Sequence, residues 1–175
     1  VVAVPLASGQ FLERSTILST LLAFVAFCAA SSAVYLTNDI LDREADRRHP
    51  VKRHRAIPAG LVPIPVAATV AGLLALAACI VPALLGTPGL SLLVLAYLCL
   101  QAVYVFWAKH QPVLDLASVA AGFVLRAVAG GVASGIPIST WFLTVTAASA
   151  MFVVAGKRYS ELVTHGHEGG TRHGL

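Results

Sequence analysis

The sequence predicts an all-α, polytopic transmembrane helical bundle, and its composition and charge pattern both favour this class. Hydrophobic residues make up 58% of the 175 residues and charged residues only 11%, and the mean hydropathy is +0.83. A water-soluble domain carries about 25% charged residues. The charges are clustered, and the net charge of +4 is small. A soluble globular domain, a disordered chain and a nucleic-acid-binding protein are therefore excluded.

Five segments are long and apolar enough to cross a membrane as helices, because such a span needs about 20 mostly apolar residues. The uncharged stretch from residue 56 to residue 108 is too long for one span, and Pro82, Gly86 and Gly89 divide it into two. The turn Ser-Gly-Ile-Pro at residues 134–137 separates the last two spans. The predicted spans cover residues 15–38, 64–84, 89–107, 113–133 and 139–157.

The basic residues predict how this multi-pass chain is oriented. Ten of the twelve lie in three loops that the alternation of spans places on one side, and the two opposite loops, around 85–88 and 134–138, have none. Because cytoplasmic loops carry an excess of Lys and Arg, these three loops are expected to be cytoplasmic and residues 1–14 external. The ten residues are Arg43, Arg47, Arg48, Lys52, Arg53, Arg55, Lys109, Lys157, Arg158 and Arg172.

The domain organisation is expected to be simple. We expect one transmembrane domain over residues 1–175, surrounded by membrane lipids, and an incomplete chain, because it opens on Val1 without a starting Met. Residues 39–63 are expected to form a cytoplasmic loop that contains catalytic residues. Residues 163–175 are polar and lack apolar periodicity, so a mobile tail is expected there.

Acidic residues gather where the first span ends. Asp39, Asp42 and Asp46 are three and then four residues apart, and Asn38 precedes Asp42 by four. On a helix this spacing places them on one face. Three like charges repel one another, and a Mg²⁺ ion bound with a pyrophosphate would offset that repulsion. The three aspartates are therefore candidate metal ligands, and a solvated helix end is the alternative interpretation.

A basic segment follows directly, and residues 47–55 read Arg-Arg-His-Pro-Val-Lys-Arg-His-Arg. Basic groups beside a carboxylate–metal cluster suit a polyphosphate, with Arg offering two parallel donors. The alternative is a loop that only touches anionic lipid headgroups. The candidate substrate-binding residues of this region are Asn38, Arg48, Lys52, Arg53 and Arg55.

These residues resemble the UbiA superfamily of intramembrane prenyltransferases. The pattern N-D-x-x-D-x-x-x-D, followed by a basic loop that ends near Arg55 and Gly60, carries the resemblance, and further similar stretches cover 109–138 and 141–162. The resemblance implies a bundle of nine membrane helices around a cavity, of which this chain supplies about five, the second to the sixth. One departure is Ala56, where the family usually has proline after the arginine.

A second departure bears on the substrate. The superfamily usually has a second aspartate-rich motif after the sixth helix, whereas residues 156–161 read Gly-Lys-Arg-Tyr-Ser-Glu. A user of prenyl diphosphate would be expected to carry that motif. The resemblance is therefore closer to the phosphoribosyl-transferring branch of the superfamily, which acts in actinobacterial cell-wall arabinan synthesis at the bacterial plasma membrane.

That branch implies a Mg²⁺-dependent reaction. Phosphoribosyl pyrophosphate would donate 5-phosphoribose to a polyprenyl (decaprenyl) phosphate, giving polyprenyl-phosphoryl-5-phosphoribose and pyrophosphate. One rival is a prenyltransferase of the same fold that acts on an aromatic acceptor, and another is a transporter or scaffold without enzymatic activity. The sequence leaves open whether the protein forms a homo-oligomer. The residues expected to be catalytic are Asp39, Asp42, Lys109 and Arg126.

Arg126 lies in the middle of a predicted span, where a charge is costly and normally faces a polar cavity or a partner. It is expected to point into the bundle, toward phosphate groups or an acidic partner. Direct pairing with Asp115 within one helix is disfavoured, because the two are eleven residues and three helical turns apart.

Further polar residues stand at the ends of later spans. Tyr104 and Lys109 resemble a family element that contacts phosphates, although Tyr104 also fits an interfacial position. Asp115 is expected to bind ribose hydroxyls or orient Lys109. The last group of candidates follows the fifth span and comprises Lys157, Arg158, Tyr159 and Glu161. This group could hold a second phosphate, and Glu161 could bind the metal or the ribose. The alternative for the two basic residues is that they only fix the topology.

Overall fold

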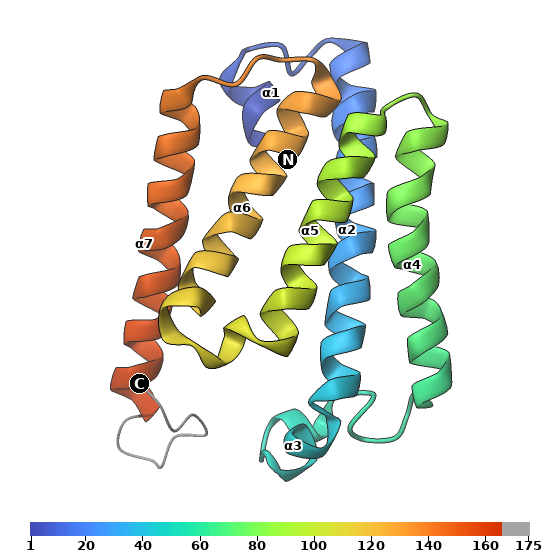
Figure 1. Ribbon diagram of the computed structural model, residues 1–175, viewed down its shortest axis with the longest axis vertical. Helices are drawn as coiled ribbons and strands as arrows, with labels where there is room; N and C mark the ends of the chain where they lie inside the picture. Colours follow the sequence, from blue (N-terminus) through green and yellow to red (C-terminus); the bar gives the residue numbers. More distant parts are fainter. Residues whose placement is uncertain (166–175) are drawn as a thin grey trace. The chain divides into compact units, whose positions relative to one another are not determined.

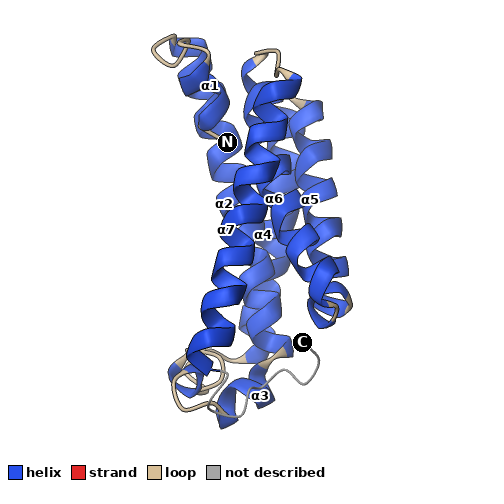
Figure 2. Cartoon of the chain, turned by 90° about the vertical axis from the view of Figure 1, so that its left-hand side faces the viewer, coloured by secondary structure: helices blue, strands red, loops and turns tan. Residues whose placement is uncertain are grey.

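The computed structural model describes residues 1–165, and every regular element in that range is a helix (Figure 2). The chain divides into two compact units. The central unit comprises Leu21–Leu98, and the terminal unit combines Val1–Thr20 with the residues from Cys99 onward.

The five predicted spans are confirmed as long helices (Figure 1). They are α2, Arg14–Leu41; α4, Ile64–Leu84; α5, Pro88–Phe106; α6, Pro112–Ser134; and α7, Thr140–His165. Each is long and apolar enough to cross a membrane. The shorter elements are α1, Ala3–Ala7; α3, Arg43–Arg48; η1, Lys52–His54; and η2, Ala108–His110.

The largest difference from the predicted boundaries is at the end of α7. The span was expected to end at residue 157, and the helix continues to His165. Lys, Arg, Glu and Leu are good helix formers, so the backbone stays helical after its apolar segment ends. Residues 163–165 of the predicted tail therefore belong to α7, and residues 166–175 lie outside the described residues.

In the central unit, an aromatic contact fixes the first part of α5 against α2. The rings of Phe27 and Tyr97 are 5.3 Å apart between centroids, and Tyr97 is buried. The Tyr97 hydroxyl lies 3.2 Å from Ser31 Oγ, within hydrogen-bond distance. Because a polar group inside an apolar bundle needs an internal partner, this pair favours one register between the two helices.

The terminal unit is built on the hairpin of α6 and α7, with α1 packed against α6. Gly135 ends α6 in the left-handed region, with φ +69° and ψ 14°, and donates its backbone N–H to the carbonyl of Gly131. Ile136 donates to the same carbonyl at 3.0 Å. The Ser139 hydroxyl then accepts a hydrogen bond from the Phe142 backbone N–H at 3.1 Å, at the start of α7. These bonds close the turn of the hairpin.

Replacing Gly135 with alanine is expected to lower the free energy of unfolding by about 1 kcal/mol, because a Cβ atom is strained at positive φ. Thermal unfolding of the detergent-solubilised protein measures the change. Gly156→Ala is the matched control, since Gly156 lies inside α7 with nothing near an added Cβ, and alanine favours a helix interior. Equal melting temperatures for Gly135→Ala and the parent protein would contradict the prediction.

Candidate functional site

The acidic residues lie where α2 passes into α3 in the central unit. Asp42 separates the two helices, with φ −87° and ψ 3°. The helical hydrogen bonding nevertheless continues across it, because the Asp42 N–H donates to the Asn38 carbonyl and the Asp46 N–H to the Asp42 carbonyl, both at 2.8 Å. The segment therefore keeps nearly helical spacing. Asn38, Asp39 and Asp42 are all half-buried.

Arg55 connects the first and the last of these aspartates. Its Nη1 donates to Asp39 Oδ1 at 2.9 Å and to Asp46 Oδ2 at 3.0 Å. The two carboxylates thus lie on the same side, as their spacing predicted. Charge-assisted bonds of this kind are stronger than neutral ones. The guanidinium therefore offsets the repulsion between two acidic groups that a helix alone would not tolerate well.

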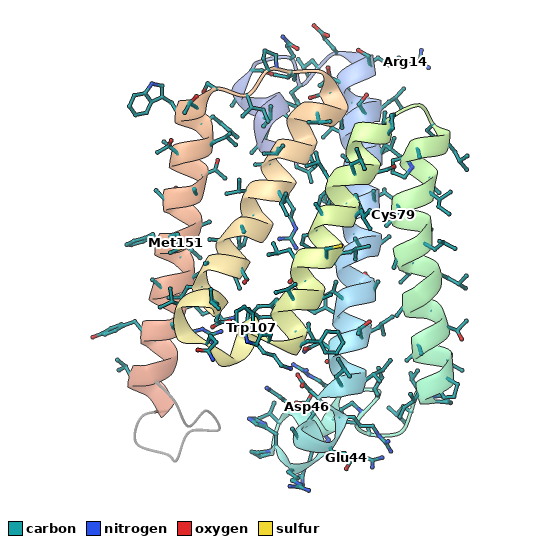
Figure 3. The ribbon with its side chains drawn as sticks, viewed as in Figure 1. Arg14, Glu44, Asp46, Cys79, Trp107 and Met151 are labelled. Carbon is teal, nitrogen blue, oxygen red and sulfur yellow. The ribbon has the colours of Figure 1, made fainter. Side chains whose placement is uncertain are left out.

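Asp46 is the most enclosed member of the acidic group. Its side chain is 6% exposed, and its Oδ1 lies 3.9 Å from Lys52 Nζ. Glu44, on the same short helix, is 69% exposed and pairs with Arg47. Figure 3 shows the two labelled residues on α3, with Asp46 toward the end of α2 and Glu44 at the outer side. Lys52 and Arg55 therefore fold back onto Asp46, whereas Arg47 pairs with Glu44.

Several contacts that were not predicted from the sequence hold this loop in place. Arg47 Nε donates to the Pro58 carbonyl at 3.0 Å. His49 Nδ1 accepts hydrogen bonds from the backbone N–H groups of Val51 at 3.2 Å and Lys52 at 3.3 Å. The only cue in the sequence is His49 standing directly before Pro50, which favours a turn.

The end of the loop shows how the chain accommodates Ala56. Arg55 adopts φ −63° and ψ 151°, the extended conformation that a following proline would impose. The Ala56 carbonyl accepts hydrogen bonds from the backbone N–H groups of Leu61 at 2.9 Å and Val62 at 3.2 Å. Gly60 allows this turn through a φ of +78°.

Two predicted phosphate-binding residues lie apart from the acidic group. Arg48 and Arg53 are exposed, and neither forms an ion pair with a carboxylate among the described side chains. Arg53 Nε instead donates to His54 Nε2 at 3.3 Å. Lys52 and Arg55 are thus the basic residues of the loop that the structure brings to the aspartates.

In the terminal unit, Asp115 and Arg158 form an ion pair between α6 and α7. Asp115 lies in the first turn of α6, where its backbone N–H donates to the Gln111 carbonyl at 2.8 Å. Its side chain is 5% exposed. Both residues were predicted as site candidates, but their contact with each other was not predicted. Asp115 precedes the turn at 135–139 by about as many residues as Arg158 follows it. The register of an antiparallel helical hairpin could therefore have predicted that the two residues face each other.

The other predicted residues of the terminal unit lie at varied depths. Tyr104 on α5 and Lys109 on η2 are half-buried, whereas Lys157 and Tyr159 on α7 are exposed. The side chain of Glu161 lies outside the described part of the chain.

Arg126 is half-buried on α6, with its guanidinium carbon 5.7 Å from the centroid of the Phe123 ring. This is the geometry of a cation–π contact, which lowers the cost of a charge inside an apolar span.

The acidic residues suit a magnesium ion that arrives with a phosphate ligand. Among the described residues, no group of three His, Cys, Asp or Glu side chains lies close enough together to hold a metal on its own. Mg²⁺, however, is usually bound through one or two carboxylates plus substrate phosphates. Asn38, Asp39 and Asp42 offer hard oxygen atoms at one helix end, so their donor chemistry fits this mode of binding.

Comparison with known proteins identifies the family. The sequence profile described as the UbiA prenyltransferase family matches residues 1–162. The chain belongs to the UbiA prenyltransferase family. Members of this family are membrane helical bundles, so the five long helices of this UbiA chain make it a multi-pass membrane protein. UbiA prenyltransferases are generally dependent on divalent metal ions.

Three similar UbiA proteins carry the name decaprenyl-phosphate phosphoribosyltransferase. The protein from Corynebacterium glutamicum is 46% identical over 97% of this chain and 52% of its own length. That from Mycolicibacterium smegmatis is 51% identical over 80% of this chain and 44% of its own length. That from Mycobacterium tuberculosis is 47% identical over 93% of this chain and 55% of its own length. The chain thus spans about half the length of these relatives.

Proposed function

We propose that the protein carrying this chain is a Mg²⁺-dependent phosphoribosyltransferase. It moves 5-phosphoribose from phosphoribosyl pyrophosphate to a polyprenyl phosphate, in the decaprenyl size class, for the synthesis of a cell-wall arabinan precursor. The similarity to the three named relatives carries this proposal. The acidic group beside Lys52 and Arg55 supports it, because a metal-bound diphosphate requires both carboxylates and cations.

The orientation in the membrane belongs to the same proposal. The protein would lie in the bacterial plasma membrane, with the loop between α2 and α4 in the cytoplasm, since that loop is rich in Lys and Arg. This placement suits the substrates. Phosphoribosyl pyrophosphate is soluble and would reach the loop from the cytoplasm, whereas the polyprenyl tail would remain among the apolar helices.

The pyrophosphate of the donor would bind at the end of α2. Asn38, Asp39 and Asp42 would hold Mg²⁺, which neutralises negative charge on the leaving group when it is bound. Lys52 and Arg55 would donate hydrogen bonds to the pyrophosphate oxygens, and the exposed Arg48 and Arg53 would attract the anion. The loop would thereby hold the leaving group.

The chemical step needs little proton transfer. An oxygen of the polyprenyl phosphate attacks the anomeric carbon of the ribose, and the bond from that carbon to the pyrophosphate oxygen breaks. The attacking phosphate is already anionic, so no strong general base is required. Residues that donate to the pyrophosphate accelerate the reaction, because they stabilise charge that builds up on it in the transition state.

Residues of the terminal unit would serve the second phosphate-bearing substrate. Lys109 and Arg126 carry charges suited to phosphate groups, and Tyr104 adds a hydroxyl. Lys157 and Tyr159 are exposed on α7 and accessible to a ligand. Arg158 is already paired with Asp115, so this pair would hold α6 to α7 and support its neighbours.

The experiment that tests the function uses membranes carrying the full-length protein. Labelled phosphoribosyl pyrophosphate, polyprenyl phosphate and Mg²⁺ are supplied, and label is counted in the lipid phase. Label is expected to enter the lipid only when all three are present, and to disappear with a metal chelator. Absence of label, together with prenyl transfer from a prenyl diphosphate to an aromatic acceptor, would overturn the proposal in favour of the other UbiA activity.

A further inference from the structure

We propose that Asp46 is a positioning residue that holds Arg55 and Lys52 for the diphosphate, and that it does not bind the metal. This inference rests on the proposed function in one respect: the ligand is taken to be a metal-bound diphosphate. It assigns different tasks to aspartates that look equivalent in the sequence motif.

Both oxygens of Asp46 face cations of the loop. Oδ2 accepts the hydrogen bond from Arg55 Nη1 at 3.0 Å, and Oδ1 lies 3.9 Å from Lys52 Nζ. The carboxylate is 6% exposed. A buried carboxylate is stable only when such partners compensate for its lost hydration. Moving Asp46 onto a metal would break both contacts.

Arg55 is held at one end of its guanidinium group. Both hydrogen bonds that its side chain makes with the described residues leave from Nη1, so Nε and Nη2 donate to no group in that part of the chain. The side chain is 45% exposed. A guanidinium has five N–H donors in a planar fork. The carboxylates therefore fix one end of the fork, and the Nε–Nη2 edge can take a phosphate with two parallel bonds.

Asp39 differs from Asp46 in its exposure and its place on the chain. Asp39 shares Nη1 of Arg55, but it is 29% exposed and stands beside Asn38 at the end of the long helix α2. It can thus exchange the arginine for a metal at a lower desolvation cost than Asp46. Asp46 would keep Arg55 anchored while Asp39 turns to the ion.

The test uses the full-length protein in detergent with two probes that need no turnover, Mn²⁺ alone and inorganic pyrophosphate with Mg²⁺. Asp46→Asn is expected to weaken pyrophosphate binding about tenfold and to raise the KM for the donor more than it lowers kcat. Its affinity for Mn²⁺ should equal that of the parent protein. Glu44→Gln, on the exposed side of α3, is the matched control and should change neither affinity.

A double-mutant cycle separates positioning from general damage. If Asp46 acts through Arg55, the double variant Asp46→Asn with Arg55→Gln should lose less pyrophosphate affinity than the product of the two single losses. Any loss beyond that of Arg55→Gln alone is the part that acts through Lys52. Independent, multiplying losses would overturn the inference. So would a loss of Mn²⁺ affinity in Asp46→Asn as large as that in Asp42→Asn.

A further variant covers a folding failure of Asp46→Asn. Asp46→Glu keeps the charge, and it should fold, bind Mn²⁺ as the parent does and lose part of the pyrophosphate affinity. Loss of Mn²⁺ affinity in this variant would overturn the inference. These binding results are independent of the group transferred, so a protein that shows the expected pattern but transfers no phosphoribose would overturn the proposed function alone.

Discussion

Replacing Asp42 with asparagine is expected to lower phosphoribosyl transfer about a hundredfold while leaving the bundle folded. A bound metal contributes several kcal/mol of charge stabilisation in the transition state, and about 3 kcal/mol corresponds to this factor. The fold should survive because asparagine has nearly the same shape as aspartate. Asp42 also joins α2 to α3 through its backbone groups, which the substitution retains.

The lipid-phase assay measures this effect across a range of Mg²⁺ concentrations. The variant should need more Mg²⁺ for half-maximal rate than the parent protein, because one carboxylate ligand has been lost. Glu44→Gln is the matched control, because Glu44 is exposed and lies two residues after Asp42. This variant should transfer phosphoribose at the parental rate. Parental activity and parental Mg²⁺ dependence in Asp42→Asn would remove Asp42 from the metal site.

The second large effect is expected on stability, from Asp115→Asn. The change removes the carboxylate partner of Arg158 in a pair where Asp115 is 5% exposed. Removing one member of a buried ion pair costs about 3–5 kcal/mol, and the cost here is expected near the lower end of that range because the Arg158 side chain is 21% exposed. We therefore expect a lower free energy of unfolding and a weaker attachment of α7 to α6.

Thermal unfolding in detergent, together with proteolysis of the α7 end, measures the change. Lys157→Gln is the matched control, because Lys157 neighbours Arg158 on α7 but is exposed, and its effect should stay within about 0.5 kcal/mol. Removing both charges, in Asp115→Asn with Arg158→Gln, should restore part of the stability. If Asp115→Asn has the same melting temperature as the parent protein, the ion pair does not stabilise the hairpin of α6 and α7.

The spans could be predicted because a membrane leaves few alternatives. Backbone polar groups in lipid must be satisfied internally, so long apolar stretches become helices. The end of α7 was harder to predict, because no hydrophobic signal marks where a helix stops once it has left the apolar region. The observed continuation to His165 depends on helix propensity and packing instead.

The acidic group was partly predictable. The spacing of Asp39 and Asp46 indicated a shared side, and both reach one nitrogen of Arg55. The choice of Arg55 over Arg53 depends on the path of the loop, which Arg47 and His49 fix through contacts with the backbone. Such contacts have no periodic pattern in the sequence, so composition and spacing cannot reveal them.

The turn after Arg55 has a consequence for which substitutions the loop tolerates. Its closure depends on a main-chain carbonyl at position 56 and on the positive φ of Gly60, and the side chain at position 56 takes no part in those bonds. Many residue types can therefore occupy position 56 without changing how the arginine is presented. Position 60 has no such latitude, because a side chain would strain the conformation that brings Leu61 and Val62 back to the carbonyl.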